Sequence, residues 1–196
     1  MNEEARDQAH RFLRPDERLI AACGYALAPG VPQPPESLLA PPDPADLGRR
    51  IEARLPGALR QLLTSRSHDT HRSRAAGPAV GGTAHGTGME GGWESSAGRL
   101  LIGRAGVRGS VTGVLAVTDR RWFGLSDVSP VWQNTPALRQ YWEAPRLEVA
   151  ALRANPAGAH PKGRMDIEFT DGSWVALLAS VPAHAPAFAA AAVRFH

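Results

Sequence analysis

One hairpin constrains the fold of this chain more than any other feature of its sequence. Residues 165–170 (MDIEFT) alternate between apolar and polar side chains, residues 173–179 (SWVALLA) are almost entirely apolar, and Asp171-Gly172 joins them. An Asp-Gly loop between such segments is typical of a β-hairpin with a type I′ turn, which needs positive φ at both central residues. The sequence therefore predicts two adjacent antiparallel strands, with one set of side chains facing the interior: Met165, Ile167 and Phe169.

The rest of the second half predicts further strands and one closing helix. Strand-like patterns occupy residues 18–27, 100–103, 111–118, 121–125 and 147–152. The stretch 111–118 is apolar on both faces, as in a central strand, and in 18–27 we expect one face to carry Leu19, Ala21, Cys23 and Tyr25. An alanine-rich helix follows Pro182, with Phe188, Ala192 and Phe195 on one side. These elements predict an α+β fold: a small antiparallel β-barrel or sandwich closed by a C-terminal helix.

Glycine and proline divide the chain into three parts. Seven of the 17 prolines lie within residues 29–44, and eight of the 20 glycines lie within residues 77–98. Residues 1–27 are expected to form a short helix (2–13) and the first strand. Residues 28–98 are then an insertion made of a proline-rich spacer, amphipathic helices and a glycine-rich loop. We expect this loop, residues 64–98, to be disordered, because it buries too little apolar surface to offset the entropy of ordering. Residues 99–196 form the main body.

An amphipathic stretch lies inside this insertion. Apolar residues recur at helical spacing over residues 47–63, and Pro56-Gly57 divides the stretch into two short helices or one kinked helix. The apolar stripe, which includes Ile51 and Leu55, packs either on the chain's own sheet or on a partner or second copy. Periodicity does not separate these alternatives.

Charge and cysteine content predict the cellular location of the protein and the kind of partner it binds. The net charge is +3, and Lys162 is the only lysine among 22 basic residues, so no dense basic stripe predicts nucleic-acid binding. A single cysteine excludes an internal disulfide framework. The charged N-terminus lacks the apolar core of a signal peptide, and no apolar run approaches the roughly 20 residues of a transmembrane helix. We therefore expect a soluble, cytoplasmic protein.

No motif predicts catalysis, a metal or a cofactor. Residues 86–91 match G-x-G-x-x-G but lack the flanking strand and helix that dinucleotide binding requires. His68 and His71 lack further zinc ligands, and Cys23 sits in an apolar strand, as a buried, inert thiol does. The carboxylates Asp166, Glu168 and Asp171 are expected on a solvated strand face. The chain is accordingly predicted not to be an enzyme.

Aromatic residues and arginines provide the candidate partner-binding surface. Trp132, Tyr141 and Trp142 lie in a segment without regular patterning, where they either cap the open end of the barrel or form an interaction surface. Arg120 and Arg121 follow a tight turn, where they are either solvated or available to an anionic partner.

Several of these segments together resemble the bacterial pleckstrin-homology-like domains, relatives of the GRAM-type modules. The resemblance lies in "PDERLIAA" at the first strand, "GVLAVTDRRWFGLS", "PRLEVAAL" and "GRMDIEFTDGSWVALLA" before a terminal helix. It implies a β-rich module that binds lipid head groups, peptides or other domains. The inserted residues 28–98 depart from the family pattern, and the basic phosphoinositide-binding loop has no clear counterpart.

The sequence thus favours a non-catalytic protein-interaction or scaffolding module, acting on another protein or on itself. The first alternative is a peripheral module that binds anionic lipid, which predicts vesicle binding that salt abolishes. The second is a small-ligand carrier or an enzyme with an unrecognised site, which requires a pocket with convergent polar groups.

Overall fold

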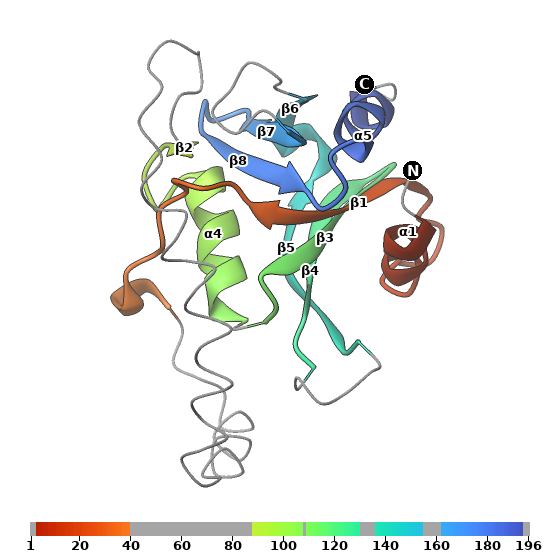
Figure 1. The fold of residues 1–196 in the computed structure, drawn as a ribbon, viewed down its shortest axis with the longest axis horizontal. Helices are drawn as coiled ribbons and strands as arrows, with labels where there is room; N and C mark the ends of the chain where they lie inside the picture. Colours follow the sequence, from red (N-terminus) through yellow and green to blue (C-terminus); the bar gives the residue numbers. More distant parts are fainter. Residues whose placement is uncertain (1–2, 40–87, 108, 130–135, 155–161, 194–196) are drawn as a thin grey trace, which may run out of the picture.

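A curled antiparallel sheet forms the body of the protein (Figure 1). The computed structural model describes residues 3–39, 88–107, 109–129, 136–154 and 162–193. Its helices and 3₁₀ turns are α1 (Glu3–His10), η1 (Glu36–Leu38), α4 (Ser96–Gly106), η2 (Arg146–Glu148) and α5 (His184–Val193). Its strands are β1 (Leu19–Leu27), β2 (Met89–Glu90), β3 (Thr112–Thr118), β4 (Arg121–Asp127), β5 (Leu138–Pro145), β6 (Val149–Ala154), β7 (Arg164–Phe169) and β8 (Trp174–Ala179).

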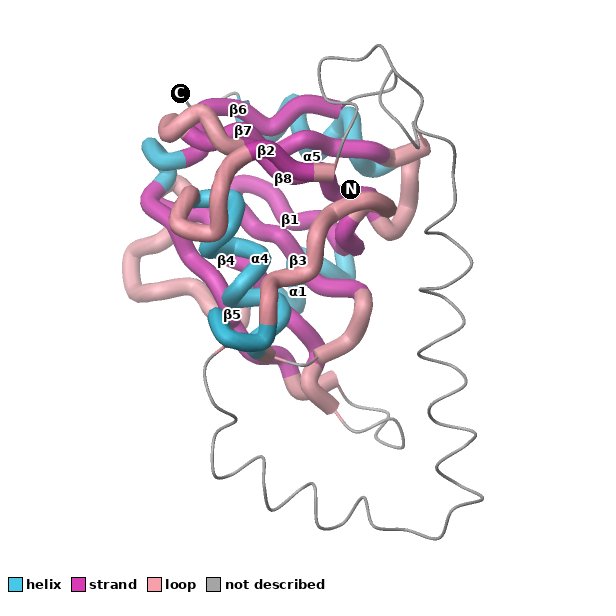
Figure 2. The backbone as a smooth tube through the Cα atoms, turned by 90° about the vertical axis from the view of Figure 1, so that its left-hand side faces the viewer, coloured by secondary structure: helices cyan, strands magenta, loops and turns pink. Residues whose placement is uncertain are grey.

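The sheet is open, so of the two predicted forms, barrel or sandwich, the barrel is wrong. Its strand order is β5-β4-β3-β1-β8-β7-β6, with β2 added beside β8, and no ladder joins β5 to β6 among the described residues. The three residues of η2 carry the chain directly from one edge strand to the other, which brings the two edges together at a single corner. Helix α4 lies against β5 (Figure 2), and a Cβ at Gly103 would be 2.6 Å from the Tyr141 carbonyl oxygen. The helix therefore occupies the place where a closing strand pair would form.

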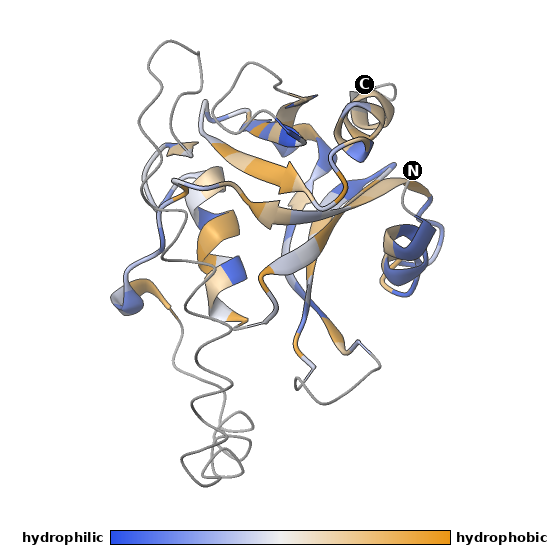
Figure 3. Cartoon of the chain, viewed as in Figure 1, coloured by the Kyte–Doolittle hydropathy of each residue, from blue (hydrophilic) through white to orange (hydrophobic). Residues whose placement is uncertain are grey.

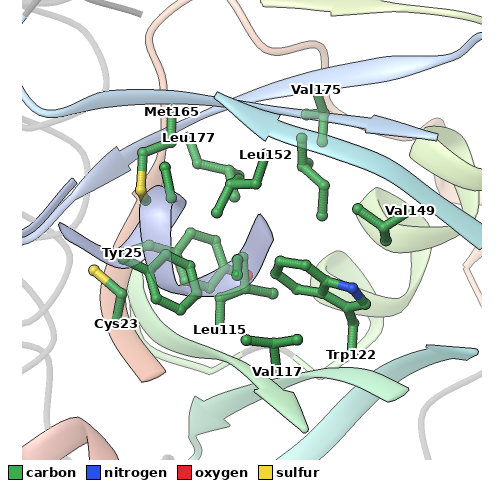
Figure 4. Packing of buried hydrophobic residues seen from close by; sticks show 14 of the residues in the cluster. Cys23, Tyr25, Leu115, Val117, Trp122, Val149, Leu152, Met165, Val175 and Leu177 are labelled. Carbon is green, nitrogen blue, oxygen red and sulfur yellow. The ribbon is translucent and has the colours of Figure 1, made fainter. Parts of the chain in front are cut away.

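The core lies inside the curl. Side chains from β1, β3 and β4 meet those from β6, β7 and β8 across the interior, as Figure 4 shows for Tyr25, Leu115 and Trp122 opposite Leu152 and Val175. The α+β class is confirmed. The predicted C-terminal helix is α5, whose Phe188 and Ala192 belong to this core, whereas Phe195 lies outside the described residues.

The outer face of the sheet is covered as well. Val114 and Ala116 of β3 pack outward with Ala5 and Ala9 of α1, while Leu115 and Val117 point inward, which confirms β3 as a strand buried on both faces. Helix α1 is otherwise hydrophilic (Figure 3).

A β-bulge changes one prediction for β1. Ala21, Cys23 and Tyr25 share the inner face as expected, but Leu19 packs on the outer face with α1. The ladder with β3 shifts register between Leu19 and Ala21, which inserts Ile20 as an extra residue. One inserted residue reverses the side on which the preceding side chain lies.

The predicted β7–β8 hairpin is present with a different turn. Gly172 has a φ of +82°, whereas Asp171 has no positive φ, so the turn is not type I′. The Phe169 carbonyl accepts from Gly172 N–H (3.0 Å), and Phe169 N–H donates to the Ser173 carbonyl (2.8 Å). This is a type I turn followed by a left-handed glycine, the usual three-residue hairpin loop.

Residues 100–103, predicted as a strand, belong to helix α4. Ser95 caps the helix by accepting the Gly98 N–H (3.2 Å), and the hairpin loop supplies two further acceptors: Asp171 Oδ2 for Ser96 N–H (2.7 Å) and Ser173 Oγ for Ala97 N–H (3.1 Å). These capping groups come from a distant part of the sequence, so local pattern did not reveal the helix.

The predicted boundary between residues 98 and 99 therefore falls within a helix, and residues 88–98, expected in a disordered loop, form β2 and the start of α4. The amphipathic stretch 47–63 lies outside the described residues.

Candidate functional site

The predicted partner-binding residues fall into two groups. Ile51, Leu55 and Trp132 lie outside the described residues, as do His68 and His71. Tyr141 and Trp142 lie on β5, and Arg120 and Arg121 lie at the β3–β4 turn.

Arg121 is engaged inside the protein. Its side chain is 6% exposed, and its Nε lies 2.9 Å from Glu17 Oε1, whose side chain is fully buried. The same guanidinium lies 2.7 Å from Glu143 Oε2, donates to the Phe12 carbonyl (2.8 Å) and stacks over the Phe123 ring (4.6 Å). All three nitrogens of the guanidinium have hydrogen-bond partners within the protein, so Arg121 stabilises the fold and is not presented to an anionic partner.

The β3–β4 turn interlocks with the turn that precedes β1. Thr118 Oγ1 donates to Glu17 (2.9 Å) and accepts the N–H groups of Arg120 (3.1 Å) and Arg121 (2.9 Å). Asp119 Oδ1 accepts Arg18 N–H (2.9 Å), and the Arg18 carbonyl accepts Asp119 N–H (3.1 Å). Two of the four segments that carry the family resemblance, "PDERLIAA" and "GVLAVTDRRWFGLS", thus contact each other. Arg120 itself is exposed.

The Tyr141 side chain links strand β5 to the core. It is the extra residue where the β4–β5 ladder shifts register, and its ring lies over Gly124, where a Cβ would collide with it. Its hydroxyl is hydrogen-bonded to the hydroxyl of Tyr25, and the Arg104 guanidinium lies 5.5 Å from its ring centre. Burial raises the pKa of Tyr25 to about 12, so this phenol stays a neutral hydrogen-bonding group at physiological pH. For Tyr141 these contacts favour the capping interpretation.

Trp142 is only half-buried and borders a hollow. Its ring meets Phe169 edge-on, with centroids 6.1 Å apart. The hollow has a volume of about 360 Å³ and lies between the start of α4 and the β5–η2 corner. We call it the corner pocket; its lining residues are Ser96, Arg99, Tyr141, Trp142, Glu143, Pro145 and Glu148.

The corner pocket has an aromatic wall and a mixed-charge rim. The first free N–H groups of α4 already bind Asp171, Ser173 and Ser95, so the helix start offers no cradle for an anion. Burial alone would raise the pKa of Asp171, but hydrogen bonds from Ser173 and Ser96 lower it well below its usual range. The exposed rim charges are Arg99 and Glu143, which have opposite signs.

An exposed apolar side chain stands beside this pocket. Leu147, at the centre of η2, is 80% exposed, the largest exposure among the large hydrophobic residues that the structure describes. The neighbouring Pro145 is exposed too. We define the docking corner as Trp142, Pro145, Leu147 and the corner pocket. The sequence pattern indicated Trp142 but not Leu147, because the exposure of Leu147 depends on the 3₁₀ turn η2.

A second hollow of about 330 Å³ lies between α1 and the start of β3. Its polar lining includes Asp127, whose Oδ1 already accepts the N–H groups of Ser129 (2.9 Å) and Ala137 (3.2 Å). Within the described ranges there is no cluster of three or more residues able to hold a metal ion.

Other charged groups are buried in pairs or hydrogen bonds. Asp166, expected on a solvated face, is fully buried and accepts from Arg164 Nε at 2.8 Å. Arg146 is 7% exposed and donates to the carbonyls of Thr118 (2.9 Å) and Ala192 (2.7 Å), which ties the end of α5 to the β3–β4 turn. Cys23 is confirmed as a buried thiol, and burial raises its pKa to about 11, which leaves it protonated and unreactive.

Comparison with protein-family models, curated proteins and solved structures finds no match to this chain. None of the helices among the described residues has both the length and the apolar character needed to cross a bilayer.

Proposed function

We propose that this chain is a non-catalytic protein-interaction module of pleckstrin-homology-like type that binds a protein partner at the docking corner. The observation that carries the proposal is Leu147, an aliphatic side chain 80% exposed that lies in the chain between Pro145 and Glu148, two residues that line a hollow together with the half-buried Trp142. An apolar anchor next to an aromatic wall, with charges at the rim, is the composition of a protein-binding hot spot.

The pleckstrin-homology-like assignment draws support from the arrangement of the elements. The antiparallel sheet and the C-terminal helix packed on its core are elements that the resemblance implies, and two of the segments that carry it meet at Thr118 and Arg18. Helix α4, which covers the edge of β5, is an addition to the pattern described by the resemblance.

The alternatives find less support among the described residues. Arg104, Arg121, Arg146 and Arg164 are all at most 8% exposed, which removes them from any surface that could attract anionic lipid. Serine hydroxyls line both hollows, but among the described residues neither hollow is lined by a histidine, the usual base that activates such a hydroxyl.

The test is a selection of displayed random peptides on the purified full chain, followed by calorimetric titration of the enriched peptides. Each peptide is titrated against the wild type, against Leu147→Asp and against Val111→Asp. Val111 is a matched control because it is another exposed aliphatic residue (58%) and lies outside the docking corner.

We expect Leu147→Asp to weaken binding by roughly tenfold or more, as loss of a hot-spot side chain does, and Val111→Asp to leave it unchanged. Equal binding to all three proteins would refute the docking corner, and so would a selection that enriches no peptide. Both substitutions are at the surface, so thermal melts of the variants should match the wild type.

A further inference from the structure

A proline-rich segment with exposed proline rings follows strand β1. It spans residues 31–35 (Val-Pro-Gln-Pro-Pro) and runs down the left side of Figure 1 to the 3₁₀ turn η1, which is drawn in orange. The sequence alone predicts only an extended spacer here. The segment shares no residue with the docking corner or with the lining of the corner pocket, so it is a second surface of the molecule.

The residue types restrict this segment to the polyproline II conformation. A proline ring fixes φ at about −65°, and the residue before a proline is held in the extended region. At least one of these two restrictions applies to every residue from Val31 to Pro35. Pro35 has a φ of −60° and a ψ of 146°, which are polyproline II values.

The burial of the side chains repeats with the period of this helix, which makes about three residues per turn. Val31 and Pro34 are half-buried, and Val31 packs against the apolar cluster that contains Trp174. Pro32 and Pro35 are exposed. One edge of the helix therefore lies on the body of the protein, while another presents two proline rings to solvent. Prolines at this P-x-x-P spacing dock into the aromatic-lined grooves of proline-recognition domains.

A tight turn anchors the start of the segment. Val31 N–H donates to the Ala28 carbonyl (3.2 Å), and Gly30 has a φ of +89°, as a type II turn requires at its third residue. Gly88 lies against this turn so closely that a Cβ there would collide with the backbone of Gly30 and Val31. The helix is thus held in its binding conformation before a partner arrives, which lowers the entropic cost of association.

The 3₁₀ turn η1 sets the chemistry at the other end. Leu38 N–H donates to the Pro35 carbonyl (3.0 Å), so η1 begins directly after the second exposed ring. Glu36 is exposed, and Leu38 is 37% exposed. A partner that covers the two rings therefore meets an acidic and an apolar side chain at this end. Charge complementarity then favours a groove with a basic residue beside its aromatic side chains.

We propose that Pro32 and Pro35 form a ligand for a proline-recognition protein whose binding groove is lined by aromatic side chains and carries a basic residue at one end. The exposed rings pack on the aromatic side chains, and Glu36 pairs with the basic residue. This inference goes beyond the proposed function, because the chain binds a peptide at the docking corner, whereas here the chain is itself the ligand.

The experiment is calorimetric titration of the full chain into a panel of purified SH3, WW and EVH1 domains, which bind prolines in aromatic-lined grooves. The panel includes domains with a basic residue at one end of the groove. Each domain that binds is titrated again with Pro32→Ala, Pro35→Ala and Glu36→Lys. Pro136→Ala is the matched control, because it removes an exposed proline from another part of the chain.

We expect at least one domain with a basic residue in its groove to bind the wild type with a dissociation constant of about 100 µM or lower. Pro32→Ala and Pro35→Ala should each weaken this binding by roughly tenfold or more, since each removes a ring and a restriction on the backbone. Glu36→Lys should weaken it by roughly threefold or more at low salt, and Pro136→Ala should leave it unchanged. The substitutions are at the surface, so thermal melts should match the wild type.

A wild type that binds none of the domains at about 500 µM overturns the proposal, since that limit excludes even a weak specific complex. Binding that survives both Pro32→Ala and Pro35→Ala also overturns it, and so does binding that Pro136→Ala weakens equally. Binding that needs both rings but is insensitive to Glu36→Lys overturns the basic residue in the groove. The peptide titrations with Leu147→Asp use a different surface, so failure of either proposal leaves the other standing.

Discussion

Replacing Arg121 with methionine should destabilise the protein more than any surface substitution, because it leaves a buried carboxylate without its cation. The Glu17 side chain is fully buried, and its carboxylate would retain only the hydroxyl of Thr118 and the N–H of Arg14 (both 2.9 Å). Removing one partner of a buried ion pair costs about 3–5 kcal/mol. Against a total stability of about 5–15 kcal/mol for a domain, this loss is a large fraction.

The reciprocal change, Glu17→Gln, should cost less. Arg121 would keep Glu143 at 2.7 Å and the Phe12 carbonyl at 2.8 Å, and Glu143 is 43% exposed, so part of the charge remains compensated. We expect a loss of about 2–3 kcal/mol, which is below the range for a buried charge left without compensation. The double variant, with Glu17→Gln and Arg121→Met, should lose clearly less than the sum of the two single changes.

The assay is urea unfolding followed by tryptophan fluorescence, with the slope held equal between variants. Phe123→Leu serves as a packing control, because Phe123 stacks on Arg121 without carrying charge. A cost below about 1 kcal/mol for Arg121→Met, which is the usual limit for an exposed ion pair, would refute the view that this pair is buried and structural. Strict additivity in the double variant would refute the coupling.

Two further predictions concern helix α4 and acid stability. Gly98→Ala should lower the free energy of unfolding by about 1–3 kcal/mol, because the added Cβ would lie 2.5 Å from the backbone of Trp93. Gly106→Ala has open space around it and should raise the free energy of unfolding by roughly 0.5–1 kcal/mol. Chemical denaturation measures both changes, and equal effects would contradict the close approach at residue 98. Burial opposes ionisation of Glu17 and Asp171, but hydrogen bonds lower their pKa values below the ordinary 4.5 and 3.8. Both carboxylates therefore stabilise the fold at pH values above their ordinary pKa, and this stability is lost as the pH falls below it. Urea midpoints between pH 7 and pH 3 should therefore decrease, and Asp171→Asn should flatten that decrease; a variant with an unchanged slope would show that the α4 contacts of Asp171 do not depend on its charge.

The local sequence pattern predicts those strands whose identity depends only on neighbouring residues. Alternation and a glycine at the turn identified β7 and β8, and continuous apolar residues identified β3 as central, because these signals depend only on neighbouring residues. The turn type was predicted wrongly because Asp171 uses its side chain to cap α4, a contact with a residue 75 positions away. The same distant contact explains why residues 100–103 form part of a helix although their local pattern predicts a strand.

The candidate site was predicted only in part, for a similar reason. An aromatic segment near residue 142 signals a surface or a cap, but the choice depends on neighbours that the sequence does not bring together, such as Gly103 and Gly124 around Tyr141. Arg121 looked like an exposed turn residue because its partner Glu17 lies more than a hundred residues earlier. The sequence does not indicate that Leu147 is exposed, since a leucine after Pro145 and Arg146 is equally compatible with a buried strand.

Hydrogen–deuterium exchange of the full chain, with and without an enriched peptide, tests the central claim most directly. Binding at the docking corner predicts slower amide exchange in residues 141–152, which span the end of β5, η2 and β6, and unchanged exchange at the β3–β4 turn. Protection confined to the Arg120 turn or to the hollow beside α1, with residues 141–152 unaffected, would contradict the account.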